Sequence, residues 1–194
     1  MTDSEVGRAV IDKTRLPDAF PTHLLDASFW EQLGRVVGTF GALEEVLGKA
    51  IFGLTGTRRI EESEAPKALD EWGKALERAL TEPLGPLIES FEKAVREHPG
   101  ATLENLDDLL ALLRAASKVR NALCHGSWQS PDEHGRSKPL FVDKKLSVFD
   151  TAVDVPFLQQ TQRHAAELMC EVISTVTHMG IQFPGSDGPG EPVW

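Results

Sequence analysis

The chain has 194 residues, 41% of them hydrophobic, which is enough for one folded domain with a sizeable core. Its net charge of −10 argues against a protein that holds nucleic acid through its overall charge. The start, Met-Thr-Asp-Ser-Glu, has no signal-peptide pattern, and the longest purely apolar run, 109–113, is far too short to span a membrane. We therefore expect a soluble, cytoplasmic protein.

The first quarter of the chain predicts an arm followed by a long helix. Residues 1–27 are polar and hold no sustained period, so we expect an N-terminal arm that packs through a few apolar side chains (Leu16, Phe20 and Leu24). A helix is predicted from about residue 28 to 54, with Ser28 and Glu31 as a capping box. Its apolar residues alternate steps of three and four, which is typical of a bundle seam: Leu33, Val36, Phe40, Leu43, Leu47, Ala50 and Leu54. Glu44 and Glu45 lie in mid-helix, where either both are solvated or one of them faces the site across the bundle.

Two more helices are predicted in the middle of the chain. One has Pro66 in its first turn, is broken by the proline-rich residues 83–86, and continues as a further segment over 87–95. The next runs over 102–125, where apolar residues recur at helical spacing: Leu103, Leu106, Leu109, Leu110 and Leu113. Gly126 follows, and we expect it to end this helix in the left-handed conformation.

The last part of the chain predicts an insertion, a final helix and a tail. Residues 127–151 hold no helical period, and the segments 139–142 and 146–149 predict a small hairpin. The final helix begins with Asp154 as its N-cap and ends near Gly180, after which the sequence is rich in proline and glycine. We predict an all-α fold, an up-down bundle of four principal helices with a small irregular or hairpin insertion between the last two. The expected organisation is an N-terminal arm (1–27), a helical bundle domain (28–180) and a flexible tail (181–194).

The strongest candidate for chemistry is the stretch from Val119 to Gly126, at the end of the third predicted helix. His125 lies among carbonyls that have no partner inside the helix, and the planar guanidinium of Arg120 suits phosphate oxygens. The structural alternative is that the histidine only caps those carbonyls, while the arginine stem lies along the apolar seam. On a regular helix these two side chains point about 140° apart, whereas Asn121 and His125 share a face. Arg120 reaches the same site only if the last turn unwinds or a second copy of the helix faces the first.

Arg120, Asn121, His125 and Gly126 spell Arg-Asn-x-x-x-His-Gly, which resembles the signature of the HEPN superfamily, helical-bundle proteins that are often metal-independent ribonucleases. The resemblance covers six or seven residues together with the helical layout. It implies that His125 acts as general acid or base, that Arg120 stabilises charge on the phosphate, and that Asn121 orients one of them. The 2′-hydroxyl of RNA is then the internal nucleophile, so neither a metal nor a cofactor is expected. A toxin or defence role is the usual setting of such proteins, which adds an antitoxin protein to the expected partners.

A basic segment surrounds this motif. From Leu109 to Phe149 seven lysines and arginines accompany three acidic residues, a net charge of +4, which leaves −14 for the remainder. We therefore name four candidate RNA-binding residues, three lysines for flanking phosphates and an aromatic ring for base stacking: Lys118, Lys144, Lys145 and Trp128. The alternatives are a solvated helix flank for the lysines and a place in the core for the tryptophan.

Two functions remain open at this stage. The first is an endoribonuclease that acts on RNA as a homodimer with the motif at its interface, so that each copy brings its own arginine and histidine to a shared cleft. The second is a non-catalytic helical module that binds RNA or another protein, which the acidic total charge favours. Whether Arg120 and His125 open to solvent or are buried against apolar neighbours distinguishes the two.

Other sequence patterns that mark chemical sites are absent. No glutamate lies three residues before any of the six histidines, as the pairs of a di-iron bundle would require, and the sequence contains neither a phosphate-binding loop nor a Cys-x-x-Cys pair. The two cysteines, Cys124 and Cys170, fall in apolar helical runs, so we expect two buried, reduced thiols.

Overall fold

The structure, a computed structural model, describes residues 10–57, 60–101 and 104–188. Within these residues the fold is mostly helical, which confirms the all-α class. Its helices are α1 (Ala27–Gly56), α2 (Ala65–Thr81), α3 (Leu84–Arg96), α4 (Leu106–His125) and α5 (Val155–His178). Two short 3-10 helices, Lys13–Arg15 and Glu62–Glu64, and a small sheet of β1 (Ser127–Trp128) and β2 (Pro139–Leu140) complete it. The predicted broken helix is two separate helices, α2 and α3.

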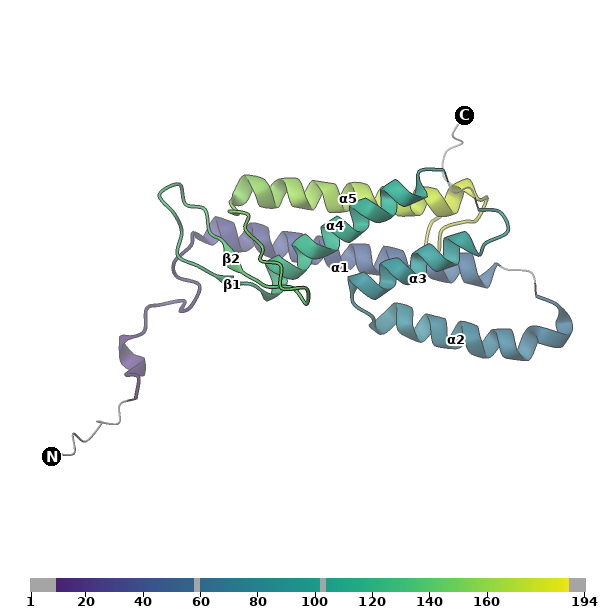
Figure 1. Cartoon of the computed structure of the whole chain (residues 1–194), viewed down its shortest axis with the longest axis horizontal. Helices are drawn as coiled ribbons and strands as arrows, with labels where there is room; N and C mark the ends of the chain where they lie inside the picture. The colour runs from purple at the N-terminus through teal and green to yellow at the C-terminus, as the bar shows by residue number, and fades with distance from the viewer. Residues whose placement is uncertain (1–9, 58–59, 102–103, 189–194) are drawn as a thin grey trace.

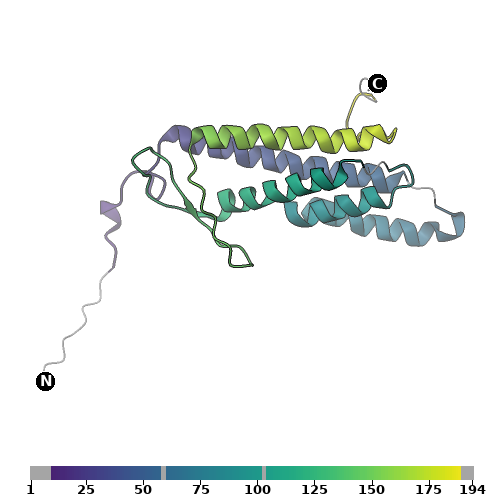
Figure 2. The ribbon, with the colours of Figure 1, turned by 45° about the horizontal axis from the view of Figure 1, so that its top comes forward.

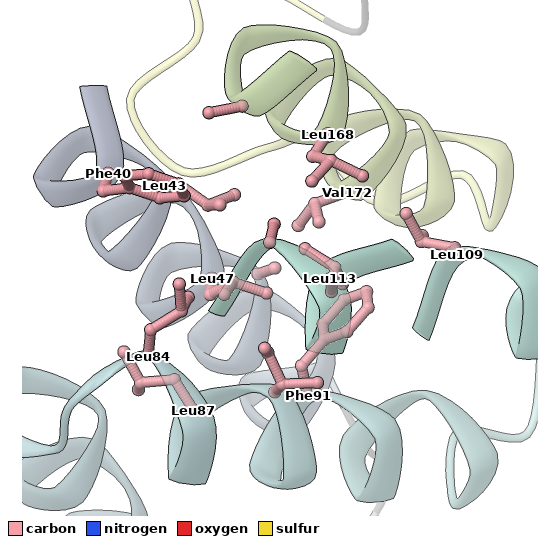
Figure 3. Close-up of a cluster of buried hydrophobic side chains, with 14 of the residues drawn as sticks. Phe40, Leu43, Leu47, Leu84, Leu87, Phe91, Leu109, Leu113, Leu168 and Val172 are labelled. Carbon is pink, nitrogen blue, oxygen red and sulfur yellow. The ribbon is translucent and has the colours of Figure 1, made fainter. Parts of the chain in front are cut away.

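Helix α1 lies at the centre of the molecule and contacts all four of the other helices (Figure 1). Every residue of its predicted seam is buried, from Leu33 to Leu54. Figure 3 shows side chains of this seam, such as Leu43 and Leu47, gathered with residues of α3, α4 and α5 in one buried cluster. The period of three and four in the sequence therefore identified the core face of α1 along its whole length.

Helix α2 lies at the outside of the molecule (Figure 1). Ala79 is its one buried residue, and it approaches α1 closely because the helix there carries Gly48: a Cβ at that glycine would lie 3.2 Å from the Ala79 carbonyl oxygen. Leu69 and Leu80 on the same helix are exposed. The apolar side chains of α2 are thus only partly covered.

The structure bears on three predicted helix starts, with a different outcome for each. The capping box at the start of α1 is wrong: the helix begins at Ala27, Asp26 is the N-cap, and Glu31 instead pairs with Arg35 one turn further on. Helix α4 begins at Leu106, and residues 102 and 103 of its predicted start lie outside the described residues. The N-cap of α5 is confirmed, because the Asp154 carboxylate accepts the backbone N–H of Phe157 at 2.8 Å.

Gly126 ends α4, but the left-handed conformation predicted for it is wrong. Its φ is −71° and its ψ is 143°, which is extended backbone. The glycine is needed for space instead, because a Cβ there would overlap the Cβ of Pro139 and lie 2.5 Å from the Ala122 carbonyl oxygen. The chain can therefore leave α4 and run directly under β2.

The insertion between α4 and α5 contains the predicted hairpin together with a pairing that was not predicted. Val142 bridges Val148, and the N–H of Phe149 donates to the Phe141 carbonyl at 3.0 Å, as expected for a hairpin of 139–142 with 146–149. In addition, β2 pairs antiparallel with β1, with Ser127 opposite Leu140. A second bridge, Ser137 to Val153, extends the hairpin pairing in the same register. Residues 137–142 therefore form a middle strand between two neighbours.

The two ends of the described chain depart from expectation in opposite ways. In the arm, the side chains of Leu16, Phe20 and Leu24 are exposed, so their predicted packing is wrong. In the predicted tail, Phe183 is buried, and Pro184 lies against Gly53 of α1, where a Cβ would be 3.5 Å from the proline ring. The first residues after α5 thus belong to the packed part of the molecule. Among the described residues, no helix has both the length and the apolarity that a membrane span requires.

Candidate functional site

Arg120 points from α4 toward α1 and is held there by two neighbours. Its Nη2 donates to Oε1 of Glu44 at 3.0 Å, which forms an ion pair, and its Nη1 donates to Oδ1 of Asn121 at 3.2 Å. The side chains of Arg120 and Glu44 are only 19% and 24% exposed. The guanidinium is therefore fixed in orientation and partly withdrawn from water.

Glu44 joins three helices at this point. The same Oε1 that pairs with Arg120 also accepts the backbone N–H of Leu84, the first residue of α3, at 3.2 Å. The preceding residue, Pro83, caps α3 without any side-chain hydrogen bond, so a carboxylate from α1 satisfies one of the amides that a helix start leaves unpaired. Of the two glutamates that the sequence placed in mid-helix, Glu44 is the one that faces this site, whereas Glu45 pairs with Lys49 at 2.7 Å. Both lie between the seam residues Leu43 and Leu47, so the sequence alone did not select between them.

His125 is in a different situation, although it follows Arg120 by only five residues. It is the last residue of α4, its side chain is exposed, and it makes no hydrogen bond or ion pair to any residue that the structure describes. The helix stays regular to its end, since the Gly126 N–H donates to the Ala122 carbonyl at 2.9 Å. The last turn therefore does not unwind to bring arginine and histidine together. One points into the molecule and the other into solvent.

Cys124, next to the histidine, is exposed, and so is Cys170, which makes the prediction of two buried thiols wrong. Partial burial of the Cys124 thiol group nevertheless raises its pKa above the usual 9.0; the positive charge of Arg120 opposes this rise and the negative charge of Glu44 adds to it. A raised pKa leaves little thiolate at neutral pH, so the geometry does not favour a nucleophilic cysteine at this position.

Two of the predicted RNA-binding lysines come together near a single carboxylate. The pKa of Asp143 lies below its usual value, first because the Ser147 N–H donates to it, and further because of the Lys145 N–H and the charges of Lys145 and Lys118. Lys118 of α4 is thus close enough to the turn after β2 for its charge to act on Asp143, and Lys144 and Lys145 are exposed in that turn.

A shallow groove of about 670 Å³ runs between the start of α3 and the middle of α4. Ser117 and Lys118 form its α4 wall, and Gly85 and Pro86 form part of its α3 wall. Its rim carries both signs of charge, and Arg114 is already paired with Glu89 across it at 3.0 Å. The groove therefore lacks the single sign of charge that would favour an anion.

Trp128 packs against the core, which was the alternative to its candidate role in base stacking. Its ring meets Phe29 edge to face, with centroids 4.9 Å apart, and Trp30 at 6.2 Å. The side chain is half-buried and packs against the core. This aromatic cluster fixes the start of the sheet on the first turn of α1.

No group of three or more histidine, cysteine or acidic residues in the described part of the chain is arranged to hold a metal ion. The chain matches no protein-family model, and comparisons with curated proteins and with solved structures find no significant match either. The fold and the site together define a mostly helical protein in which Arg120 is held between α4 and α1 and His125 is exposed at the end of α4.

Proposed function

We propose that this protein is a metal-independent endoribonuclease of the HEPN type. The observation that carries the proposal is the exposed, unbonded imidazole of His125 at the end of α4, five residues after an arginine that Glu44 and Asn121 hold in place. We propose the matching architecture as well, an up-down bundle of α1, α3, α4 and α5 with α2 outside it. A toxin or defence role, with an antitoxin as partner, is part of the same proposal.

The reaction would use the 2′-hydroxyl of RNA as nucleophile. The 2′-oxygen attacks the adjacent phosphorus while a base removes its proton, the bond to the 5′-oxygen breaks, and an acid protonates that leaving oxygen. A cyclic phosphate and a 5′-hydroxyl result. His125 takes one of the two proton-transfer roles, and Arg120 stabilises the charge on the phosphate, with Asn121 and Glu44 orienting its guanidinium. Lys118, Lys144 and Lys145 bind flanking phosphates.

The directions of the two side chains support a homodimer as part of this proposal. Within one copy, Arg120 points toward α1 and His125 points into solvent, so one chain cannot readily aim both at the same phosphate. Two copies of α4 that meet about a two-fold axis bring two arginines and two histidines to one cleft. Mixing wild-type chain with excess His125→Ala chain by unfolding and refolding should then reduce activity more than dilution alone.

A second function is favoured by one specific observation. The Arg120–Glu44 ion pair, with its hydrogen bond to Leu84, is complete without any ligand, and it joins three helices. An arginine with this purely structural task belongs to a non-catalytic helical module that binds RNA or protein. Such a module does not cleave RNA, so His125→Ala and wild-type protein would both leave the RNA ends unchanged.

The deciding experiment is incubation of pure protein with mixed RNA in EDTA, followed by analysis of the ends. Cleavage should leave cyclic phosphate or 3′-phosphate, and should spare both DNA and RNA with 2′-O-methyl groups. His125→Ala should abolish it. His178→Ala is the matched control, because His178 is also the last residue of its helix and exposed, and it should keep full activity.

Wild-type protein that binds RNA and leaves it intact would argue for the non-catalytic module. Cleavage that survives His125→Ala, or that cuts 2′-O-methyl RNA, would contradict the proposed site and route instead, since it would assign the activity to a different site or to a contaminant.

A further inference from the structure

The shallow groove between α3 and α4 contains a polar side chain that has no partner inside the protein. Ser117 is only 8% exposed, yet its hydroxyl makes no hydrogen bond to any residue that the structure describes. Hydroxyls elsewhere in these helices, such as those of Thr39 and Thr161, donate to the carbonyl four residues earlier. Ser117 lines the groove instead. A nearly buried hydroxyl without a protein partner indicates that a ligand group bonds it from the groove.

Gly85, on the opposite wall, leaves the space above this hydroxyl open. A Cβ at Gly85 would have the Ser117 Oγ as its nearest atom on another helix, at 4.0 Å. The backbone does not require a glycine here, because Gly85 lies in the first turn of α3 and does not have a positive φ. Any other residue would place its side chain over the hydroxyl. The glycine therefore keeps the Ser117 hydroxyl within reach of a ligand.

Both walls of the groove begin at the Arg120–Glu44 ion pair. Leu84, whose N–H donates to Glu44, immediately precedes Gly85. Ser117 precedes Arg120 by three residues, so their side chains share one face of α4, about 4.5 Å apart along the helix axis. Figure 1 and Figure 2 show α3 and α4 side by side, with the small sheet beyond the end of α4. A ligand in the groove therefore lies next to the guanidinium that we assign to the phosphate.

The charged groups of the groove suit a neutral ligand that donates a hydrogen bond. Arg114 and Glu89 are already paired with each other at 3.0 Å. Glu82 is half-buried in the lining, and its carboxylate makes no ion pair or hydrogen bond to a described residue. A free carboxylate accepts the exocyclic amine of a nucleobase, and the flat face of the base can lie on Pro86. Lys118, exposed at the rim, is placed for the phosphate of the same nucleotide.

We propose that this groove is a nucleobase subsite, which takes a base with an exocyclic amine (adenine, cytosine or guanine) in preference to uracil. The amine donates to the Glu82 carboxylate, and the Ser117 hydroxyl bonds another polar atom of the base. In RNA, the base belongs to the nucleotide next to the phosphate at Arg120. That last placement rests on the proposed ribonuclease function. The binding of the base does not, and it is tested without any cleavage.

The test is an NMR titration of the full ¹⁵N-labelled chain with cytidine and with uridine. These two nucleosides have the same size and differ at C4, where cytosine carries an amine and uracil a carbonyl oxygen. Neither carries a phosphate, so the lysines and arginines contribute little to binding. Cytidine should shift the amide signals of Gly85 and Ser117, and uridine should bind about threefold to tenfold more weakly, as expected for one lost hydrogen bond.

Two variants should weaken cytidine binding without loss of stability. Ser117→Ala removes a hydroxyl that has no protein partner to lose, so its unfolding midpoint should equal that of wild type. Gly85→Ala covers the hydroxyl with a methyl group and should unfold at or above the wild-type midpoint, because alanine favours the helix. Gly73→Ala on α2, where a Cβ meets open space, is the matched control and should bind cytidine like wild type.

A third variant tests the choice of base. Glu82→Gln should remove the preference for cytidine over uridine, because the new amide can donate to the uracil carbonyl. Glu77→Gln on the exposed side of α2 is its control and should keep the preference. A purely structural role of Glu82 would not change the ratio of the two affinities.

The proposal is overturned if cytidine leaves the signals of Gly85 and Ser117 unchanged, if uridine binds wild type as tightly as cytidine, or if Ser117→Ala and Gly85→Ala bind cytidine like wild type. Protein that binds cytidine as expected but leaves RNA intact supports the subsite and removes the ribonuclease function. Cleavage of RNA by a protein that binds neither nucleoside does the reverse, so the two failures are distinct.

Discussion

The two halves of the motif differ in every physical respect, although they share one helix. The inner half, Arg120 with Asn121 and Glu44, is mostly buried, hydrogen-bonded and ion-paired, and it connects α4 to α1 and to the start of α3. The outer half, His125, is exposed and unbonded among the described residues, and Gly126 beside it is pressed under β2. The inner half has a role in the fold whether or not the protein has an activity. No contact within the described residues gives the histidine a role in the fold.

This difference separates stability from function in a way that substitutions can measure. Variants of the inner half and of Gly126 should change the free energy of unfolding, and variants at His125 should not. The predictions below run from the largest expected effect to the smallest.

Gly126→Ala should be the most damaging of these changes. The added Cβ overlaps Pro139 and the Ala122 carbonyl, and both belong to packed backbone that cannot move aside cheaply. Overpacking of this kind costs about 2–3 kcal/mol. Urea unfolding followed by circular dichroism measures it. Gly135→Ala is a poor control because its φ is positive, whereas Gly73→Ala on α2 has open space and should not lose stability.

Arg120→Ala should destabilise the protein by about 1–2 kcal/mol. Removing one partner of a fully buried ion pair costs about 3–5 kcal/mol, and the remaining exposure of these two side chains reduces that value. Glu45→Ala is the control, because Glu45 sits beside Glu44 but pairs with Lys49 on the surface, where the loss is about 0–1 kcal/mol. Equal unfolding midpoints for Arg120→Ala and wild type would contradict a stabilising role for the Arg120–Glu44 ion pair.

The Cys124 thiol reports the charge balance of the inner half. Because its pKa is raised, alkylation at pH 8 should be slow and should accelerate as the pH rises through that pKa. Glu44→Gln removes a negative charge and should speed the reaction, while Arg120→Ala removes a positive charge and should slow it. Iodoacetamide kinetics in a Cys170→Ser background measure both. A change in the same direction for both variants would exclude this electrostatic account.

His125→Ala should have the smallest effect on stability, within about 0.5 kcal/mol, as for surface substitutions that touch no special feature. The same variant should have the largest effect on RNA cleavage if the proposed function is right. A strongly destabilised His125→Ala protein would place the histidine in the fold after all, and would favour the non-catalytic module.

The sequence by itself determined the helical class, the core face of α1 and the N-cap of α5, because these depend on local periodicity and capping chemistry. It also located Arg120, Asn121 and His125 near a helix end. The sequence wrongly predicted that Cys124 is buried, whereas the buried residue is Leu123. A seam counted in steps of three and four drifts around a helix of 3.6 residues per turn, so its last positions are the least certain to face the core.

Only the tertiary structure decided which acid meets Arg120 and why Gly126 is a glycine. Each of these depends on residues far apart in the chain: Glu44 lies 76 positions before Arg120, and Pro139 reaches Gly126 through the pairing of β1 with β2. Local sequence carries no record of such distances, because they follow from how α1, α3 and α4 pack and how the chain returns after α4.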